Sequence, residues 1–302
     1  MRRSSGAMLK SRGDTVFEII NVAFMLFIIV ITVYPFLNIL AISLNDARDS
    51  AAGGIGIIPR KWSIDSYESV FRYPGIYNAF LISVARTVGG TALALALTSM
   101  AAYVMSKKYL IGYGFVYKYF VVSMFIGGGL IPTFFLYQWL RIYNTFLVYI
   151  LPSMFGVYNM ILMRTFILQL PKELEESAFL DGANEAQVYT KIILPLSKPI
   201  LATIGLFLAV GQWNSWQDTL FFTNKPELET LQYVLMKVLR QAEAAAVARQ
   251  AKMSMAKLRT ISITPDSIKM AITIVATIPI LCVYPFIQKH FVKGMMIGAV
   301  KG

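Results

Sequence analysis

Long apolar runs recur along this chain of 302 residues and constrain its fold more than any other feature. Several of them approach or exceed the roughly 20 consecutive apolar residues that a helix needs to cross a lipid bilayer. With 57% hydrophobic residues and a mean hydropathy of +0.60, the chain is too apolar for a soluble domain. The predicted fold class is therefore all-α, a polytopic membrane protein with six transmembrane helices.

Polar and charged segments between the runs set the predicted domain boundaries. The predicted segments are a cytoplasmic N-terminal tail (1–14), a first transmembrane helix (15–44), an external loop (45–75), a five-helix core (76–291) with a charged loop (169–198) and an external segment (217–266), and a cytoplasmic C-terminal tail (292–302). The core helices are expected at about 76–105, 113–137, 146–168, 200–216 and 267–287.

The formal charge of +12 is carried by lysines and arginines that lie between the apolar runs. Nucleic-acid binding needs such residues on one face, whereas this spacing is typical of anchors on the inner side of a membrane. Lys107 and Lys108 are therefore expected inside, and both termini on the same side. The 217–266 segment is also basic, but six spans place it outside, since long loops translocate largely regardless of charge.

The single cysteine and the single histidine limit the chemistry that the chain can perform. Cys282 lies inside an apolar run, so the chain can form no internal disulfide and no thiolate metal cluster. His290 follows the last run at a helix end, where we expect it to be solvated or interfacial. We predict no metal site and no catalytic residue.

Two local patterns predict further structural detail. Gly127, Gly128, Gly129 and Pro132 disfavour a regular helix within the third expected span, so a bend or a close helix contact is predicted there. In the external loop a short helix is expected near residues 63–71, with Ser63 as its cap and Asp65 complementing its dipole.

The charged loop cannot lie in the bilayer, because it carries Glu173, Glu175, Glu176, Asp181 and Glu185. Pro171 suits the first turn of a helix, where its missing N–H is not needed, and Gly182 suits a left-handed residue that ends it. Asn184, with Gln187 three residues later, predicts a capping box at the start of a second helix; Pro195 and Pro199 are expected to end this helix and to start the fifth span. The prediction is two short helices around a glycine hinge.

The acidic character of the first helix separates two interpretations of the loop. A helix that lies on anionic lipid tends to be basic, whereas an acidic, capped helix pair suits a protein socket that contains arginine. We therefore expect the charged loop to dock onto a protein outside the membrane.

The same loop resembles the EAA–G–I-LP loop of permease subunits of type I ABC importers for carbohydrates, such as the maltose-type second permease and the complex-polysaccharide permeases. The resemblance rests on Glu176-Ser177-Ala178, Gly182 and Ile192-Ile193-Leu194-Pro195, with Ser177 replacing the second alanine of the family pattern. It covers the chain from about residue 76 onward and implies the type I importer permease fold. The residues implied to couple the chain to an ATPase are Glu175, Glu176, Ser177, Ala178, Asp181, Gly182, Ala183, Ile192, Leu194 and Pro195.

The resemblance also implies partners and a location. The partners are a second homologous permease in a heterodimer, two copies of a cytoplasmic ATPase, an extracytoplasmic solute-binding protein, an oligosaccharide and membrane lipid. The chain has no G-x-x-x-x-G-K-[ST] phosphate-binding loop, so ATP and magnesium are expected on the ATPase subunits. No cofactor and no nucleic acid is expected on this chain, and the implied location is the bacterial cytoplasmic (inner) membrane.

The C-terminal residues also resemble those of maltose-type permeases, in which the end of the chain reaches between the ATPases. Lys301 and Gly302 are therefore expected to contact the ATPase. The alternative is an ordinary frayed terminus, which the glycines at 294, 298 and 302 would equally suit.

Five residues near the predicted outer half of the membrane are candidates for a substrate path: Arg86, Gln212, Trp213, Asn214 and Trp216. Flat rings mixed with hydrogen-bonding groups suit the apolar faces and hydroxyl edges of sugars, but tryptophans also form belts at membrane interfaces. Arg86 lies inside a span, where charges usually face a cavity or a partner chain. A free arginine there would suit an acidic sugar, such as a uronate oligomer.

Two other classes of protein were weighed. A secondary transporter of sugars or other small solutes is the alternative, but no proton relay and no inverted repeat is visible in the sequence. A membrane-embedded enzyme would have one histidine, one cysteine and no intramembrane carboxylate pair to work with. The transport-subunit hypothesis is therefore preferred.

Overall fold

The computed structural model describes residues 12–252 and 264–299. In these ranges all regular elements are helices, and the β-contact between Asn45 and Trp62 is an isolated bridge. The chain divides into two compact units, residues 1–71 with 241–274 and residues 72–240 with 275–302.

The first unit contains α1 (Arg12–Ser43), which is apolar on all sides. No residue in the membrane-length window of this helix is buried, as in a helix that faces lipid. Pro35 lies inside the helix and does not end it. Two short helices, α2 (Ala47–Ala51) and α3 (Asp65–Phe71), follow it in the chain.

The segment around α2 and α3 is ordered by Asn45, which is buried. The side-chain amide of Asn45 donates to Asp49, and its oxygen accepts from the backbone N–H of Lys61 at 2.7 Å. The hydroxyl of Ser63 accepts from the N–H of Asp65 at the start of α3, which confirms the short helix and its cap.

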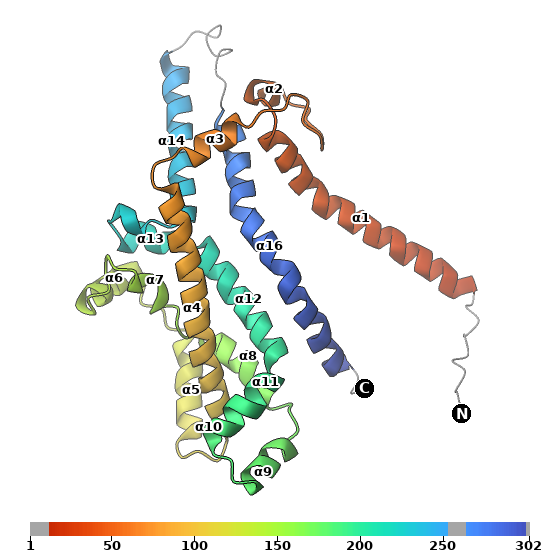
Figure 1. The fold of residues 1–302 in the computed structure, drawn as a ribbon, viewed down its shortest axis with the longest axis vertical. Coiled ribbons are helices and arrows are strands. Elements are labelled where there is room, and N and C mark those ends of the chain that lie inside the picture. Colours follow the sequence, from red (N-terminus) through yellow and green to blue (C-terminus); the bar gives the residue numbers. More distant parts are fainter. Residues whose placement is uncertain (1–11, 253–263, 300–302) are drawn as a thin grey trace. The chain divides into compact units, whose positions relative to one another are not determined.

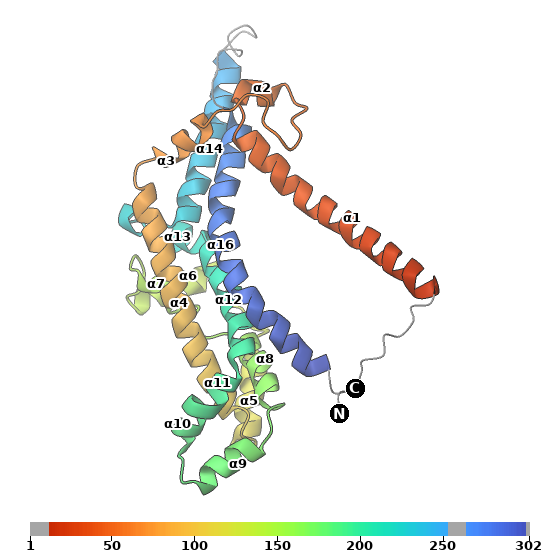
Figure 2. The same ribbon diagram turned by 45° about the vertical axis from the view of Figure 1, so that its right-hand side comes forward.

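The second unit is organised around α4 (Ile76–Val104), against which α8 (Val157–Ile167) and α12 (Lys198–Asn214) pack (Figures 1 and 2). The buried face of α4 is rich in small residues, which let neighbouring helices approach closely. These include Ala79, Ser83, Gly90 and Ala94.

Two of the expected spans are interrupted. The third consists of α5 (Tyr113–Ser123) and α6 (Leu130–Trp139), and Gly129 between them has a φ of +74°. The fourth consists of α7 (Leu147–Ile150) and α8. Figure 1 shows α6 and α7 turned away from the direction of α5 and α8. The glycine-rich bend was predicted, but the structure makes it a complete break.

The prediction of six continuous transmembrane helices is therefore not met exactly. Within the described residues three helices are long and apolar enough to cross a membrane, α1, α4 and the 265–283 part of α16 (Pro265–Ala299). A fourth span is reached if residues 185–196 and α12, which are bent by 78° at their junction, count as one.

The polar segment after α12 contains α13 (Gln217–Phe222), the short turn η2 (Pro226–Leu228) and α14 (Leu231–Lys252). The alanine-rich stretch at 240–257 has a composition that favours a helix; it is helical up to Lys252, as part of a helix that begins at Leu231, and its remaining residues lie outside the described ranges. At the other end of the chain, α16 continues to Ala299 and so extends past the tail boundary expected at residue 292.

Candidate functional site

The charged loop (169–198) begins with α9 (Glu173–Leu180), which starts two residues later than Pro171. Its end is closed by Gly182, whose φ of +83° is favourable only for glycine. The N–H of Gly182 donates to the carbonyl of Phe179, and that of Ala183 to the carbonyl of Ala178, as in a Schellman motif. The predicted glycine hinge is present.

The second half of the loop is a succession of short helical turns. Asn184 and Gln187 form the predicted capping box at the start of α10 (Glu185–Val188), with both hydrogen bonds at 2.9 Å. A π turn, η1 (Tyr189–Ile193), and α11 (Leu194–Leu196) follow. This helical path ends at Leu196, one residue after Pro195, and the chain bends by 78° into α12, which has Pro199 in its first turn.

An apolar cluster attaches this second half to the end of α4. Val188 and Ile193 are buried against Ala102 and Tyr103 of α4, together with Met160 of α8. The rings of Tyr103 and Tyr189 lie 5.4 Å apart, and the hydroxyl of Tyr189 is 2.6 Å from that of Ser99. Ile192, Ala178 and Ala183 pack at the edge of the same cluster.

Charged and phenolic groups connect the same elements. Lys107, just after α4, forms an ion pair with Glu175 of α9. Glu185 of α10 accepts hydrogen bonds from the hydroxyls of Tyr103 (2.5 Å) and Tyr109 (2.9 Å). Burial raises the pKa of the Glu185 carboxyl, but these two hydrogen bonds and the charge of Lys107 outweigh it, so the pKa is lowered. Glu185 is therefore ionised at neutral pH.

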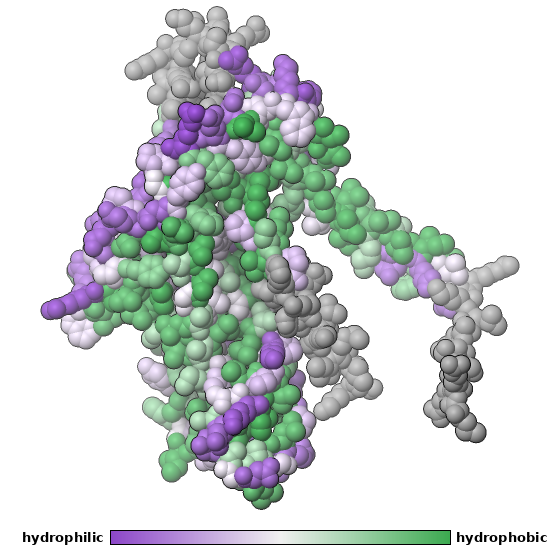
Figure 3. All heavy atoms as spheres, in the orientation of Figure 1, coloured by the Kyte–Doolittle hydropathy of each residue, from purple (hydrophilic) through white to green (hydrophobic). Residues whose placement is uncertain are grey.

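The first half of the loop, α9 and Asp181, is largely exposed in the part of the chain that the structure describes. None of the residues of α9 is buried, and Leu180 is 89% exposed. Glu176, Ser177 and Asp181 are exposed. Figure 3 shows hydrophilic residues gathered over the α9–α10 end, with apolar residues among them.

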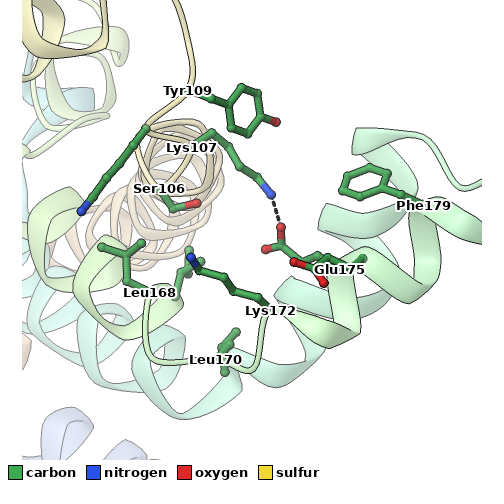
Figure 4. Close-up of a pocket in the computed structure, with 11 residues that line it drawn as sticks. Ser106, Lys107, Tyr109, Leu168, Leu170, Lys172, Glu175 and Phe179 are labelled. Atoms are coloured by element: carbon green, nitrogen blue, oxygen red, sulfur yellow. Dashed lines mark hydrogen bonds and ion pairs between the residues drawn. The ribbon is translucent and has the colours of Figure 1, made fainter.

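Two hollows flank α9. The larger, of about 640 Å³, lies between Lys107, Tyr109 and Phe179, with Lys172 and Leu168 on its other wall (Figure 4). The smaller, of about 260 Å³, is at the hinge and is lined by Asp181, Gly182, Ala183, Gln187, Val188, Lys191 and Ile192.

A second group of polar residues surrounds Arg86, whose side chain is 2% exposed. The guanidinium donates to Gln212 of α12 at 2.9 and 3.0 Å and to Asp218 of α13 at 2.5 and 3.1 Å. It also donates to the carbonyl of Ser215 at 3.3 Å, and it lies 4.6 Å from the centre of the Tyr149 ring. Arg86 is therefore compensated by Asp218 and is not a free cation.

The Arg86 group borders a cavity of about 290 Å³. Its wall combines Tyr137, Tyr149 and Phe222 with polar groups of Gln212 and Asp218. The amide of Gln212 donates to the hydroxyl of Ser153 at 2.5 Å. The wall thus combines hydrogen-bonding groups with aromatic rings, of which Tyr149 and Phe222 are buried.

The other substrate-path candidates lie elsewhere. Trp213 is buried, packs against Phe80 and donates to the carbonyl of Ala276 at 3.0 Å. It lines a separate, apolar cavity of about 200 Å³ between α4, α12 and α16. Asn214 is exposed and hydrogen-bonds Gln232, and Trp216 is partly exposed just before α13. Of the five candidates, the structure brings together Arg86 and Gln212.

Residues 94–297 match the model of a family described as the binding-protein-dependent transport system inner membrane component, which is more than half of the chain. The chain belongs to this family. The protein LplC of Bacillus subtilis is 37% identical to this inner membrane component over 98% of each chain. The polygalacturonan/rhamnogalacturonan transport system permease protein YtcP of the same organism is 37% identical over 96% of this chain and 99% of its own.

A solved structure supports the same fold for this inner membrane component. A chain in the crystal structure of a bacterial ABC transporter involved in the import of the acidic polysaccharide alginate is 27% identical, with a TM-score of 0.78. The match covers 94% of this chain and 100% of that one. The fold is therefore that of type I ABC importer permeases, and the chain is an ABC permease and not a secondary transporter.

The sequence alone did not identify several residues that contribute to these two sites. Lys107 was assigned only to topology, and Tyr103 and Tyr109 were not singled out, although they hold Glu185. Asp218 was noted beside Trp216 but not as the partner of Arg86. An aspartate some 130 positions away leaves no local pattern. The need of an intramembrane arginine for a counter-charge is the one signal that pointed to it.

Proposed function

We propose that this chain is one of two homologous permease subunits of an ATP-driven importer and that the charged loop docks onto a cytoplasmic ATPase. The observation that carries the proposal is the exposed α9, which has no buried residue and in which Leu180 and Glu176 are both exposed. An eight-residue helix is not stable in water by itself. A helix of this kind is suited to a surface that covers its apolar residues and neutralises its carboxylates.

The proposed importer contains a second permease, two copies of the ATPase and an extracytoplasmic solute-binding protein. Both termini of this chain lie on the cytoplasmic side, as does the charged loop. ATP and magnesium bind the ATPase subunits, and this chain performs no catalysis. Lys301 and Gly302, which lie outside the described residues, are proposed to contact the ATPase.

The proposed mechanism is alternating access. Closure of the two ATPases on ATP draws the docked loops together, and each loop moves the helices to which it is attached. Val188 and Ile193 pack on the end of α4, so this helix moves with the loop. The transmembrane halves then open toward the binding protein, which releases its sugar.

We further propose that the transported solute is an acidic oligosaccharide. Two similar proteins are described as handling such polymers, one polygalacturonan and rhamnogalacturonan and the other alginate. The cavity beside Arg86 and Gln212 has the aromatic and polar wall that suits a sugar. Because Asp218 already neutralises Arg86, a uronate would meet this arginine only by competing with that aspartate.

Co-purification and uptake test the docking of the charged loop. Affinity-tagged protein is expected to retain the ATPase, and Glu176→Lys is expected to lose about tenfold or more in uptake, because it reverses an outward charge. Gly182→Pro is expected to abolish uptake, because proline fixes φ near −65° where the hinge needs +83°.

Glu176→Gln is the matched control, since it removes the charge without reversing it and should reduce uptake less than Glu176→Lys. If the tagged protein retains no ATPase, or if uptake survives both Glu176→Lys and Gly182→Pro, the proposed function is wrong.

A further inference from the structure

We infer that Lys107 is a positioning residue that transmits movement of α9 into the transmembrane helix α4. The inference rests on the proposed function, since it concerns how the docked loop moves the membrane part. It assigns a role in coupling to a residue that lies outside the loop itself.

Lys107 contacts both helices of the charged loop. Its ammonium group pairs with Glu175 of α9 and lies 4.0 Å from Glu185 of α10. It also lies 4.5 Å from the centre of the Tyr103 ring and 5.8 Å from that of Phe179. The side chains of Lys107 and Glu175 are 10% and 20% exposed, so salt screens this ion pair less than it screens a fully exposed one. Figure 4 shows the lysine reaching across the hollow to α9.

The two halves of the loop are attached to α4 in different ways. The second half has the buried residues Val188 and Ile193 and a hydroxyl contact between Tyr189 and Ser99. α9 has no buried residue. Among the described residues, the pair between Glu175 and Lys107 is the one side-chain hydrogen bond or ion pair that joins α9 to the end of α4. Ala178 of α9 also packs at the edge of the apolar cluster, so a force on α9 reaches α4 through this apolar contact and, in a directional way, through the ion pair of Lys107.

The backbone around Lys107 is firmly joined to α4. Its N–H donates to the carbonyl of Val104 at 3.1 Å, which continues the helical turn beyond the last residue of α4. The guanidinium of Arg164, on α8, donates to the carbonyl of Met105 at 2.6 Å and to the hydroxyl of Tyr113 at 2.5 Å. A displaced Lys107 therefore displaces the helix and does not merely bend a flexible linker.

Neighbouring carboxylates on α9 face different partners. Glu175 pairs with Lys107, whereas Glu176 is exposed and lines the same hollow without an ion pair among the described residues. A force that a docked protein exerts on Glu176 thus acts on the residue next to Glu175, the ion-pair partner of Lys107. At the other end of the path, Arg86 is about 26 Å along α4 from Tyr103, at 1.5 Å per residue, and borders the proposed sugar cavity.

The test uses the complete importer in proteoliposomes, with both permeases, the ATPase and the binding protein. Lys107→Met keeps the length of the side chain and removes its charge. We expect this variant to retain the ATPase on co-purification but to lose about tenfold in the ATPase stimulation caused by loaded binding protein, a typical coupling effect. Lys107→Arg, which preserves the charge and the aromatic contacts, should restore most of the stimulation.

Two comparisons distinguish coupling from folding. Lys108→Met removes the adjacent charge, which lines the same hollow, and is expected to behave as wild type. The double variant Lys107→Met with Glu175→Gln is expected to be no worse than Lys107→Met alone, because the two groups act as one pair.

The inference is overturned if Lys107→Met shows wild-type stimulation of the ATPase, or if the losses in the double variant are fully additive. If the ATPase still co-purifies in these cases, the proposed function stands. A wild-type importer that retains no ATPase would instead remove the proposed function. If Lys107→Met reduces assembly and stimulation in equal proportion, the lysine is structural and the inference is also wrong.

Discussion

A buried arginine in a membrane protein needs an acceptor for each of its five N–H groups and a counter-charge. Arg86 makes five hydrogen bonds, to Gln212, Ser215 and Asp218, and lies over the ring of Tyr149. From the sequence, the same residue was expected to line the substrate path, where its charge would suit an acidic sugar. The structure shows instead a closed polar group that also fixes α13 onto α4 and α12.

The pairing predicts the effect of removing the counter-charge. Asp218→Asn leaves a buried guanidinium uncompensated and should lower the free energy of unfolding by about 2 kcal/mol, somewhat less than for a fully buried pair because Asp218 is 21% exposed. The measurement is the midpoint of thermal unfolding of the purified permease pair in detergent. Glu227→Gln, at an exposed position, is the control, and equal midpoints for both variants would show that the pair contributes nothing.

At the scale of elements, α4 and α12 approach each other where small residues allow it. A Cβ atom at Gly90 would lie 2.7 Å from Nε2 of Gln212, and one at Gly205 would lie 3.2 Å from a methyl group of Leu95. The Gly90 contact places Gln212 where it can bind both Arg86 and Ser153. Helix packing and the polar group are therefore linked.

Gly90→Ala is expected to destabilise the protein by about 1–3 kcal/mol, because the added methyl group must push Gln212 out of its position. Gly114→Ala is a matched control on α5, where nothing lies within 4 Å of the added atom, and it should be neutral or slightly stabilising. Thermal unfolding of the two variants side by side tests this. Equal stability would mean that α4 and α12 can separate without cost at this point.

At the scale of the whole molecule, the exposed α9 and the cavity beside Arg86 lie toward opposite ends of α4. The proposed docking surface and the proposed solute cavity are therefore separate parts of one chain, connected through a helix of 29 residues. A solute that binds in the cavity should therefore change the activity of an ATPase with which it makes no contact.

The proposed acidic cargo predicts a difference between charged and neutral sugars. Binding protein loaded with oligogalacturonate should stimulate the ATPase of the reconstituted importer about tenfold more than the same oligomer whose carboxyl groups have been reduced to alcohols, because a site built for a polar group rejects an analogue without it. Equal stimulation by both would contradict the acidic class while leaving the permease function in place.

Much of the loop could be predicted from the sequence because its determinants are local. Gly182 and the pair Asn184 and Gln187 specify their turns within a few residues, and the structure has both. The apolar runs likewise indicated a membrane protein, and the resemblance of the charged loop to importer permeases implied the type I permease fold, which the comparisons confirm. The features that could not be predicted depend on contacts between distant segments, such as the pairs of Arg86 and Lys107.

The prediction of the third and fourth spans as single helices failed for a related reason. Hydropathy measures how long an apolar run is, but not whether its backbone continues as one helix. The run around Gly129 and the run at 146–168 are long enough to cross a bilayer, yet each is divided between two helices. Backbone groups freed at such breaks are tolerated when the surrounding protein satisfies them, and hydropathy does not reveal those surroundings.

The π turn at Tyr189–Ile193 has a geometric consequence for the direction of the charged loop. A π turn holds one residue more than an α-helical turn, and each residue of a helix rotates the preceding segment by about 100° relative to the next one. Removing a single residue there would leave the Gly182 turn and the capping box of Asn184 and Gln187 intact but would rotate α10 about the axis of the span. The direction in which the loop points thus depends on the number of residues in the π turn as well as on their identities.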